Sequence, residues 1–215
     1  MKITILCSSF THPVNGMLSQ WVEANIIAHD VKLVRSKSEL QGGDLLFLIS
    51  CAEIINAQDR EKFKKVLVIH ASDLPQGRGW SPHIWDVLNG ASEITVSLLE
   101  AQDKVDSGDI WQNARITIPQ HFLYDEINEL LFATESQLMD FAVEHFYTIT
   151  PQPQSLSVVP SYHPRRMPAD SELDPGKSIA SQFNLLRVSD PERFPAFFKL
   201  HGHTYKVTVE KVENE

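Results

Sequence analysis

Short apolar runs alternate with longer amphipathic or polar stretches over the first third of the chain. The apolar runs have the length of single strands, and the stretches between them favour helices. Apolar strands that alternate with helices indicate βαβ units and a parallel sheet that is covered on both faces. The expected strands are residues 3–7, 31–34, 44–50 and 66–70, and the expected helices are residues 15–30 and 56–65.

The pattern continues and then changes near residue 150. Up to that point it predicts helices over residues 80–90 and 124–146 and strands over residues 92–101 and 110–118. Residues 150–168 are rich in proline, which favours an extended crossing segment rather than a packed element. A helix over 174–188 and a hairpin over 196–212, turning at His201-Gly202, are expected to follow. We therefore divide the chain into a main α/β domain, residues 1–150, and a small helix-plus-hairpin extension, residues 151–215.

Composition narrows the classes of partner. The 215 residues carry a net charge of −9 without a block of basic residues, which argues against nucleic acid as the main partner. The two cysteines, Cys7 and Cys51, each follow an apolar run, so we expect free thiols rather than a disulfide framework. The N-terminal run favours a first strand over a signal peptide. No apolar run approaches the roughly 20 residues that cross a bilayer. We expect a cytoplasmic protein with no membrane association.

Candidate chemistry gathers where two strands are expected to end. His70 closes one apolar run, Arg78 follows between two glycines, and Asp106 lies in a turn after a later strand. Taken alone, the histidine favours a structural role and the aspartate favours a turn cap. Ligands of parallel sheets bind beyond the carboxyl ends of the strands, and a His–Asp pair there can act as general acid and base. The flanking glycines are expected to bring the backbone close to a ligand and to leave the Arg78 guanidinium free.

These residues stand in an order that resembles the formyltransferase signature. In that family a segment Asn-x-His-x-Ser-Leu-Leu-Pro precedes an Arg-Gly pair, a helix with a Pro-x-x-Trp-like start, and Asp-x-Gly-x-Ile. The resemblance covers most of residues 1–147. The matching positions are His70, Ser72, Leu74, Pro75, Arg78, Gly79, Pro82, Trp85, Gly90, Thr95, Asp106, Gly108 and Ile110.

The resemblance implies a Rossmann-like domain that passes the formyl group of 10-formyltetrahydrofolate to an amine, without a metal. It implies catalytic roles for His70, Asp106 and Ser72. It also implies folate contacts by two loops, comprising Ser50, Cys51, Ala52, Glu53 and Ile54, and Lys104 and Val105. Val68 departs from the family, because an asparagine is expected there to hold the formyl oxygen. Loss of one such donor typically costs about 100- to 1,000-fold in rate.

The C-terminal segment resembles that of sugar N-formyltransferases. Those enzymes carry an Arg-Arg-x-Pro segment, a short helix and a Pro-Ala-Phe hairpin, as residues 162–211 do here. Transfer-RNA formyltransferases, in contrast, have a longer C-terminal domain and a basic face. The loop after His70 is similar to the subgroup that acts on pseudaminic-acid-type sugars. This implies a nucleotide-linked amino deoxysugar as acceptor, with UDP-linked 4-amino-4,6-dideoxy-N-acetylhexosamine as the expected form. The expected sugar-nucleotide contacts are Gly77, Arg78, Gly79, Arg165 and Arg166.

Two alternatives stay open at this point. Val68 is compatible with a relative that binds folate or a sugar nucleotide but does not turn over. A formyltransferase with another small amine acceptor, such as glycinamide ribonucleotide, is the other alternative. The apolar C-terminal hairpin is compatible with a homodimer surface or with a cover for the main sheet.

Overall fold

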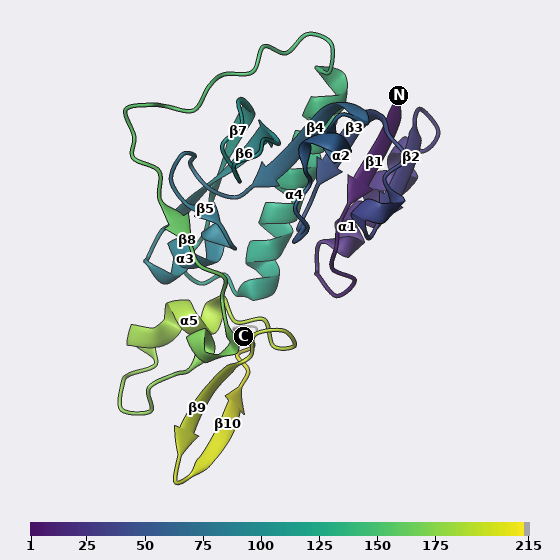
Figure 1. The fold of residues 1–215 in the computed structure, drawn as a ribbon. Coiled ribbons are helices and arrows are strands. Elements are labelled where there is room, and N and C mark those ends of the chain that lie inside the picture. The colour runs from purple at the N-terminus through teal and green to yellow at the C-terminus, as the bar shows by residue number, and fades with distance from the viewer. Residues whose placement is uncertain (213–215) are drawn as a thin grey trace.

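The computed structural model describes residues 1–212. Residues 213–215, the last three of the expected C-terminal extension, lie outside the described residues. A six-stranded sheet forms the centre of the molecule, with the strand order β2-β1-β3-β4-β6-β7 (Figure 1). Its strands are β1 (Lys2–Leu6), β2 (Asp30–Val34), β3 (Gly43–Leu48), β4 (Phe63–His70), β6 (Glu93–Glu100) and β7 (Ile110–Thr117).

The sheet has a parallel part and an antiparallel part. The strands β2, β1, β3 and β4 are parallel to one another, whereas β6 runs antiparallel to both β4 and β7. The fold is therefore the expected α/β, Rossmann-like class with a mostly parallel sheet. The carboxyl ends of β1, β3 and β4 share one edge of the sheet, and the carboxyl end of β6 faces the opposite edge.

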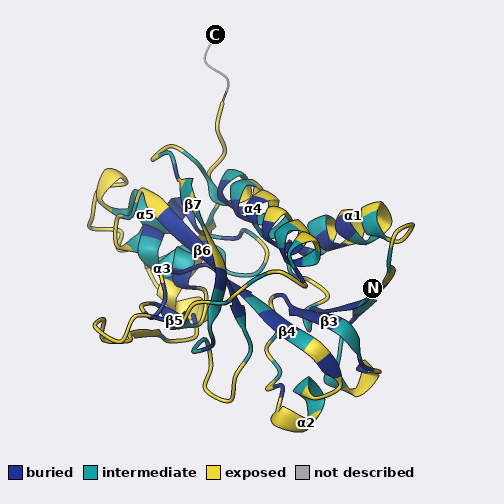
Figure 2. Ribbon diagram, turned by 90° about the horizontal axis from the view of Figure 1, so that it is seen from above, coloured by how far each residue is buried: buried dark blue, intermediate teal, exposed yellow. Residues whose placement is uncertain are grey.

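Helices cover the two faces of the sheet unequally (Figure 2). Helices α1 (Asn15–Asn25) and α4 (Tyr124–Glu144) pack on one face and build the larger core. The other face has a smaller core, whose neighbouring helix α2 (Ala57–Arg60) is only four residues long. No helix among the described residues is long and apolar enough to cross a membrane.

Two expected helices are much shorter than the sequence pattern indicates. The polar stretch 56–65 is helical only in α2, because Phe63 is buried and pairs with Gly43 as the first residue of β4. Sheet pairing thus overrides local polarity. The expected helix 174–188 is reduced to η3 (Ala180–Gln182) and α5 (Phe183–Arg187). Its first part is a turn in which the Gly176 N–H donates to the Asp174 side chain.

The segment after α4 crosses the molecule as an extended chain and leads to the C-terminal region (Figure 1). It contains β8 (Tyr162–His163), which pairs with the short strand β5 (Arg78–Gly79). The C-terminal region has its own small core, centred on Leu173, Leu186 and Ala196. The expected hairpin is present, with a turn at His201 and Gly202, where φ is +49° and +79°. The remaining elements are η1 (Lys37–Glu39), α3 (Pro82–Leu88), η2 (Pro168–Ser171), β9 (Ala196–Leu200) and β10 (His203–Val207).

The loop between β6 and β7 must turn back along the sheet, because β6 ends opposite Leu67 and not beside His70. Gly108 allows this turn, since a Cβ there would lie 1.8 Å from the Glu100 carbonyl oxygen. We expected His70 and Asp106 at two strand ends on one edge of the sheet, and this was wrong. Asp106 lies beside His70 because the loop between β6 and β7 turns back to the edge where β4 ends.

Substitution of Gly108 tests this arrangement. We expect Gly108→Ala to lower the free energy of unfolding by about 1–3 kcal/mol, because the methyl group meets backbone that cannot move alone. The matched control is Gly16→Ala in α1, where nothing lies within 4 Å of an added Cβ. Because Gly16 lies in the first turn of α1, this control should leave stability unchanged or raise it by less than the roughly 0.5–1 kcal/mol of a glycine in mid-helix. Urea unfolding measures both, and equal effects of the two variants would contradict the steric argument.

Candidate functional site

A cleft of about 790 Å³ opens along the sheet edge where β1, β3 and β4 end. For description, we divide its lining residues into two groups by the segments that carry them. The first, here named the β3 lobe, is lined by residues of the segments 48–55 and 100–106. The second, here named the α4 lobe, is lined by residues of the segments 8–13, 80–84, 124–135, 165–166 and 188–194. His70 and Gly79 line the same cleft, as does Asp106 of the returning loop.

The His70 and Asp106 side chains lie side by side in this cleft. His70 Nε2 is 3.6 Å from Asp106 Oδ2, and both side chains are more than nine-tenths buried. His70 Nε2 donates to the Gly77 carbonyl oxygen at 2.9 Å, which fixes the position of that proton. Asp106 Oδ2 accepts the Gly79 N–H at 2.8 Å. The loop that follows His70 therefore orients both side chains through its backbone.

Several residues around the His70–Asp106 pair have a left-handed backbone conformation. Four non-glycine residues have positive φ among the described residues, and three of them line the cleft: Ser50, Ser81 and Asp106. Such conformations cost about 1–3 kcal/mol each and persist only where the surroundings impose them. For Asp106 the surroundings are the hydrogen bonds that hold its loop in place.

Gln154 supplies two of those hydrogen bonds. Its Nε2 donates to the carbonyl oxygens of Asp106 (2.9 Å) and Gly108 (3.0 Å), and its Oε1 accepts from Arg78 Nη2. Arg78 also donates to the Tyr162 hydroxyl and is only 5% exposed. The expectation that the Arg78 guanidinium is free for a ligand was wrong. The crossing segment covers this side chain, which is not among the cleft-lining residues.

The two glycines beside Arg78 serve chain packing. A Cβ on Gly77 would lie 2.9 Å from the Ser72 Cβ, and one on Gly79 would lie 2.6 Å from the His163 carbonyl oxygen. The Gly77 N–H donates to Ser161 Oγ, so the crossing segment occupies the space that we expected a ligand to use. Gly79 nevertheless lines the cleft, whereas Gly77 does not.

Two further expected residues lie away from the cleft wall. Ser72 is 2% exposed, and its hydroxyl has no hydrogen-bond partner within residues 1–212. Lys104 lies beside Tyr162, whose pKa it helps to lower after the larger effect of Arg78. Val68 does line the cleft, so the position where related chains are expected to carry an amide presents an apolar side chain. The remaining expected residues that line the cleft are Ser50, Cys51, Ala52, Glu53, Ile54, Val105, Arg165 and Arg166.

The β3 lobe combines irregular backbone with apolar side chains. Residues 50–55 belong to no helix or strand, so their peptide groups are not committed to a sheet ladder. Leu48 and Ile55 line the same lobe, and Val68 of β4 lines the cleft as well. Side chains bond several of these peptide groups, as Ser8 Oγ does at Ser50 and Ala52. Apolar walls beside irregular backbone suit a flat heterocycle with polar edges. Both cysteines are free, and Cys51 belongs to this segment.

The α4 lobe holds polar side chains that the sequence analysis missed. Tyr124, Asn128 and Glu135 project from α4, His12 comes from the loop after β1, and His83 from the first turn of α3. The Asn128 amide nitrogen, Glu135 Oε2 and His83 Nδ1 are buried without a hydrogen-bond partner in the described chain. A sequence signal did exist, since Asn128 and Glu135 are polar positions seven residues apart beside the buried face of an amphipathic helix.

Burial controls the protonation of this lobe. It lowers the pKa of His83 to about 3 and that of His12 to about 4, with smaller contributions from nearby cations. It raises the pKa of Glu135 to about 8, without a compensating cation. At neutral pH both histidines are uncharged and Glu135 is largely protonated. Burial and the Asp190 carboxylate also raise the pKa of Tyr124, whose hydroxyl donates to Asp190 Oδ2 at 2.8 Å.

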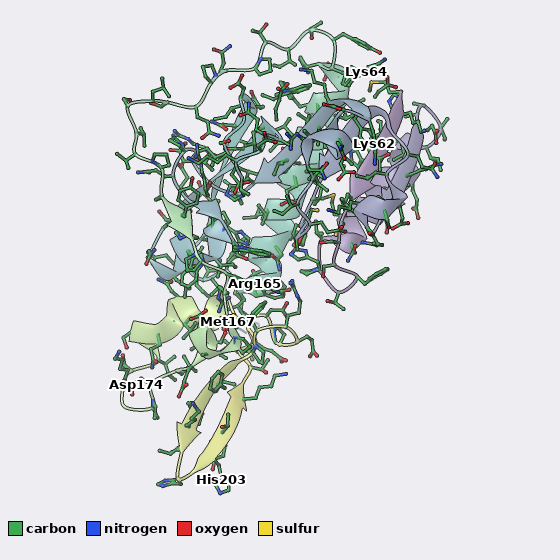
Figure 3. All side chains as sticks on the ribbon, viewed as in Figure 1. Lys62, Lys64, Arg165, Met167, Asp174 and His203 are labelled. Carbon is green, nitrogen blue, oxygen red and sulfur yellow. The ribbon has the colours of Figure 1, made fainter. Side chains whose placement is uncertain are left out.

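The two adjacent arginines diverge. Arg165 is exposed, and its guanidinium lies 5.0 Å from the centre of the Trp80 ring. Figure 3 shows it where the crossing segment enters the C-terminal region. Arg166 is 6% exposed, donates to Ser171 Oγ at 3.0 Å, and lies 5.3 Å from the centre of the Phe194 ring. The arginines thus belong to the rim and the interior of the α4 lobe, respectively.

Glu135 predicts a pH dependence of stability. Its folded pKa of about 8 lies above the value near 4.3 of an unfolded glutamate. Between these values the unfolded chain loses a proton that the folded chain keeps, so stability falls as pH rises, by up to roughly 1.4 kcal/mol per unit. We expect Glu135→Gln to be more stable than the wild type at pH 8 and equally stable near pH 4.5. Denaturant unfolding at both pH values measures the difference, and a pH-independent difference would contradict a buried, protonated Glu135.

Within residues 1–212, no group of three or more His, Cys, Asp or Glu side chains is arranged to hold a metal ion. The expectation of a metal-free reaction therefore stays a prediction.

The chain is similar to known proteins in sequence and in fold. Residues 6–143 match the formyl transferase family model. The methionyl-tRNA formyltransferase of Natranaerobius thermophilus is 31% identical over 156 residues, which are 70% of this chain and 48% of that enzyme. The chain spans about a third to a half of the length of the curated relatives that it matches.

Solved structures share the fold at lower identity. The methionyl-tRNA formyltransferase of Clostridium thermocellum has a TM-score of 0.82 at 19% identity, over 99% of this chain and 94% of that one. A sugar N-formyltransferase from a Shewanella species has a TM-score of 0.73 at 16% identity, over 99% of both chains. HypX from Aquifex aeolicus, in complex with tetrahydrofolic acid, has a TM-score of 0.77 at 21% identity, over 97% of this chain and 37% of HypX. By its sequence match and its fold, the chain belongs to the formyl transferase family.

Proposed function

We propose that the protein transfers the formyl group of 10-formyltetrahydrofolate to the amino group of a nucleotide-linked amino deoxysugar. The observation that carries this proposal is the buried His70–Asp106 pair. Both side chains line the cleft to which the two lobes belong. One lobe is then available for the formyl donor and the other for the amine. The family match supports formyl transfer, and the likeness to a folate-bound structure supports the donor.

The reaction forms one C–N bond and breaks another. 10-Formyltetrahydrofolate supplies an activated formyl carbon, which the neutral acceptor nitrogen attacks. The acceptor nitrogen loses one proton, and the departing N10 gains one, so that the products are the formamide and tetrahydrofolate. The chain must therefore hold a proton acceptor and a group that stabilises negative charge on the formyl oxygen.

Asp106 and His70 suit these two tasks. Asp106 Oδ2 has a fixed position because it accepts the Gly79 N–H, and it would receive the acceptor proton directly or through water. His70 in its protonated form would stabilise the developing oxyanion. The β3 lobe would hold the pterin against Leu48 and Val68, with the backbone of residues 50–54 at the polar edge.

The acceptor is inferred from the C-terminal segment and from charge. Arg165 and Arg166 line the α4 lobe and are suited to the phosphates of a sugar nucleotide. The likeness to sugar N-formyltransferase structures supports this class. The curated sequence relatives are methionyl-tRNA formyltransferases, but a net charge of −9 is unfavourable for tRNA. A UDP-linked 4-amino-4,6-dideoxy-N-acetylhexosamine is the specific acceptor that we propose.

A formyl-transfer assay tests the function. The protein is incubated with 10-formyltetrahydrofolate and a panel of UDP- and dTDP-linked amino sugars plus methionyl-tRNA, and mass spectrometry detects a gained formyl group. We expect product from a sugar nucleotide and none from the tRNA. His70→Gln and Asp106→Asn should each lower kcat by about 100- to 10,000-fold, the range for general acid–base groups.

The control for this assay is His203→Gln. His203 is exposed near the turn of the β9–β10 hairpin, far from the cleft (Figure 3), so its replacement should leave kcat unchanged. Formylation of tRNA alone would reject the sugar acceptor. Full activity of His70→Gln would reject the assigned chemistry.

Val68 favours a second candidate, a relative that binds ligands without turnover. An apolar side chain at this position cannot donate a hydrogen bond to the formyl oxygen. This candidate predicts that 5-formyltetrahydrofolate, a stable folate, raises the Tm while no acceptor becomes formylated. The panel assay and the thermal shift together distinguish the two candidates.

A further inference from the structure

The α4 lobe contains a buried cation that lacks a counter-ion. Arg166 lines the cleft and is 6% exposed, and its Nε is buried without a hydrogen-bond partner within residues 1–212. It takes part in none of the ion pairs of the described chain. Asp170 is near enough to influence it, but this carboxylate accepts the Met167 N–H at 2.6 Å instead. The protein leaves most of this charge uncompensated.

Two other buried arginines, Arg78 and Arg187, also have an unpartnered Nε and no ion pair among the described residues, but their terminal nitrogens have more partners. Arg187 is 2% exposed and donates to the carbonyl oxygens of Pro119 and Gln120. Arg78 donates to the Gln154 amide oxygen and the Tyr162 hydroxyl, and neither Arg78 nor Arg187 lines the cleft. Arg166 has a single hydroxyl partner and faces the cleft. The buried arginine that lines the cleft is therefore the one with the fewest protein partners.

A second guanidinium, that of Arg193, lies near the same Phe194 ring as Arg166. Arg193 lies 5.8 Å from the centre of the Phe194 ring, to which Arg166 lies 5.3 Å, and all three residues line the cleft. The nearest carboxylate to Arg193 is Asp190, with Nε 4.0 Å from Oδ2. That carboxylate already accepts the Tyr124 hydroxyl on Oδ2 and two backbone N–H groups on Oδ1. Arg193 is thus only partly neutralised.

We infer that Arg166 and Arg193, held on the ring of Phe194, form the subsite for the diphosphate of a nucleoside diphosphate. Guanidinium groups bind phosphate oxygens bidentately, and two of them on one ring suit two adjacent phosphates. The inference rests on the proposed sugar-nucleotide acceptor and deepens it, because it assigns Arg193 a role. It also moves Arg165 to the rim, where a charge affects association rate more than affinity.

The energetics favour a ligand site over a structural role. An unpaired buried charge destabilises a fold, and of the three buried arginines Arg166 alone lines the cleft, where a ligand anion can offset that cost. A bound diphosphate would supply the missing counter-charge and accept the free Nε–H. His12 and His83 are uncharged at neutral pH, and the Asp190 carboxylate is the neighbouring side chain with which a bound diphosphate would compete for Arg193.

Calorimetric titration of nucleotides tests the subsite. The probes are UDP and dTDP, each compared with its nucleoside, so that the affinity ratio isolates the diphosphate. In the wild type we expect the diphosphate to bind at least tenfold more tightly than the nucleoside. Arg166→Gln and Arg193→Gln should each reduce this ratio by roughly tenfold or more. A smaller reduction in either variant, or failure of the wild type to prefer either diphosphate, would overturn the inference.

Matched controls separate binding from folding. Arg115→Gln, whose side chain is 69% exposed on β7, should keep the wild-type ratio. Binding of 5-formyltetrahydrofolate should be unchanged in all variants, because the folate is assigned to the other lobe. Arg166→Met removes the charge and keeps an apolar contact with Phe194, so its Tm should equal or exceed that of the wild type. A fall in Tm with an unchanged affinity ratio would show a structural role and overturn the subsite.

The formyl-transfer panel distinguishes this inference from the proposed function. If UDP affinity depends on both arginines but no amino sugar is formylated, the diphosphate subsite stands and the proposed function fails. If an amine without phosphate is formylated equally well by the wild type and by both variants, formyl transfer stands and the diphosphate subsite is overturned.

Discussion

The site depends on the return of one loop across the sheet. Because β6 is antiparallel to β4, its carboxyl end lies at the edge opposite His70, and the following loop must travel back to bring Asp106 into the cleft. The Gln154 amide holds that loop by two backbone carbonyls and is itself held by Arg78. A single amide from the crossing segment thus connects the glycine-rich loop to the loop of the proposed catalytic aspartate.

The proline-rich crossing segment does more than connect the main α/β domain to the C-terminal region. It pairs with Arg78 and Gly79, covers the guanidinium, and carries Arg165 and Arg166 to the rim and interior of the α4 lobe. The same segment therefore supports the central pair and forms part of the acceptor wall. In the proposed reaction, the position of the acceptor is coupled through one stretch of chain to the position of Asp106.

The two lobes differ in the side chains that they offer to a ligand. The β3 lobe offers apolar side chains and irregular backbone, which suits a heterocycle. The α4 lobe buries cations with few partners beside histidines and a glutamate that burial keeps uncharged. A ligand that brings negative charge there competes with the Asp190 carboxylate for Arg193 but meets no such carboxylate within ion-pair distance of Arg166 in the described chain. The division agrees with a neutral pterin on one side and a phosphorylated acceptor on the other.

The sequence by itself determined the six strands of the central sheet, because short apolar runs have few alternatives in a buried sheet, and the ordered motif singled out His70 and Asp106. It also located the hairpin turn at His201, where local backbone chemistry is decisive. The short strands β5 and β8 were not expected. Tertiary structure alone decided the rest. Whether Arg78 is free or covered depends on the crossing segment, 76 residues away at Gln154. The burial that neutralises Glu135 and isolates Arg166 likewise arises only when α4 and the C-terminal region close around the cleft. Periodicity records which face of an element is apolar, but not which distant segment will pack on it.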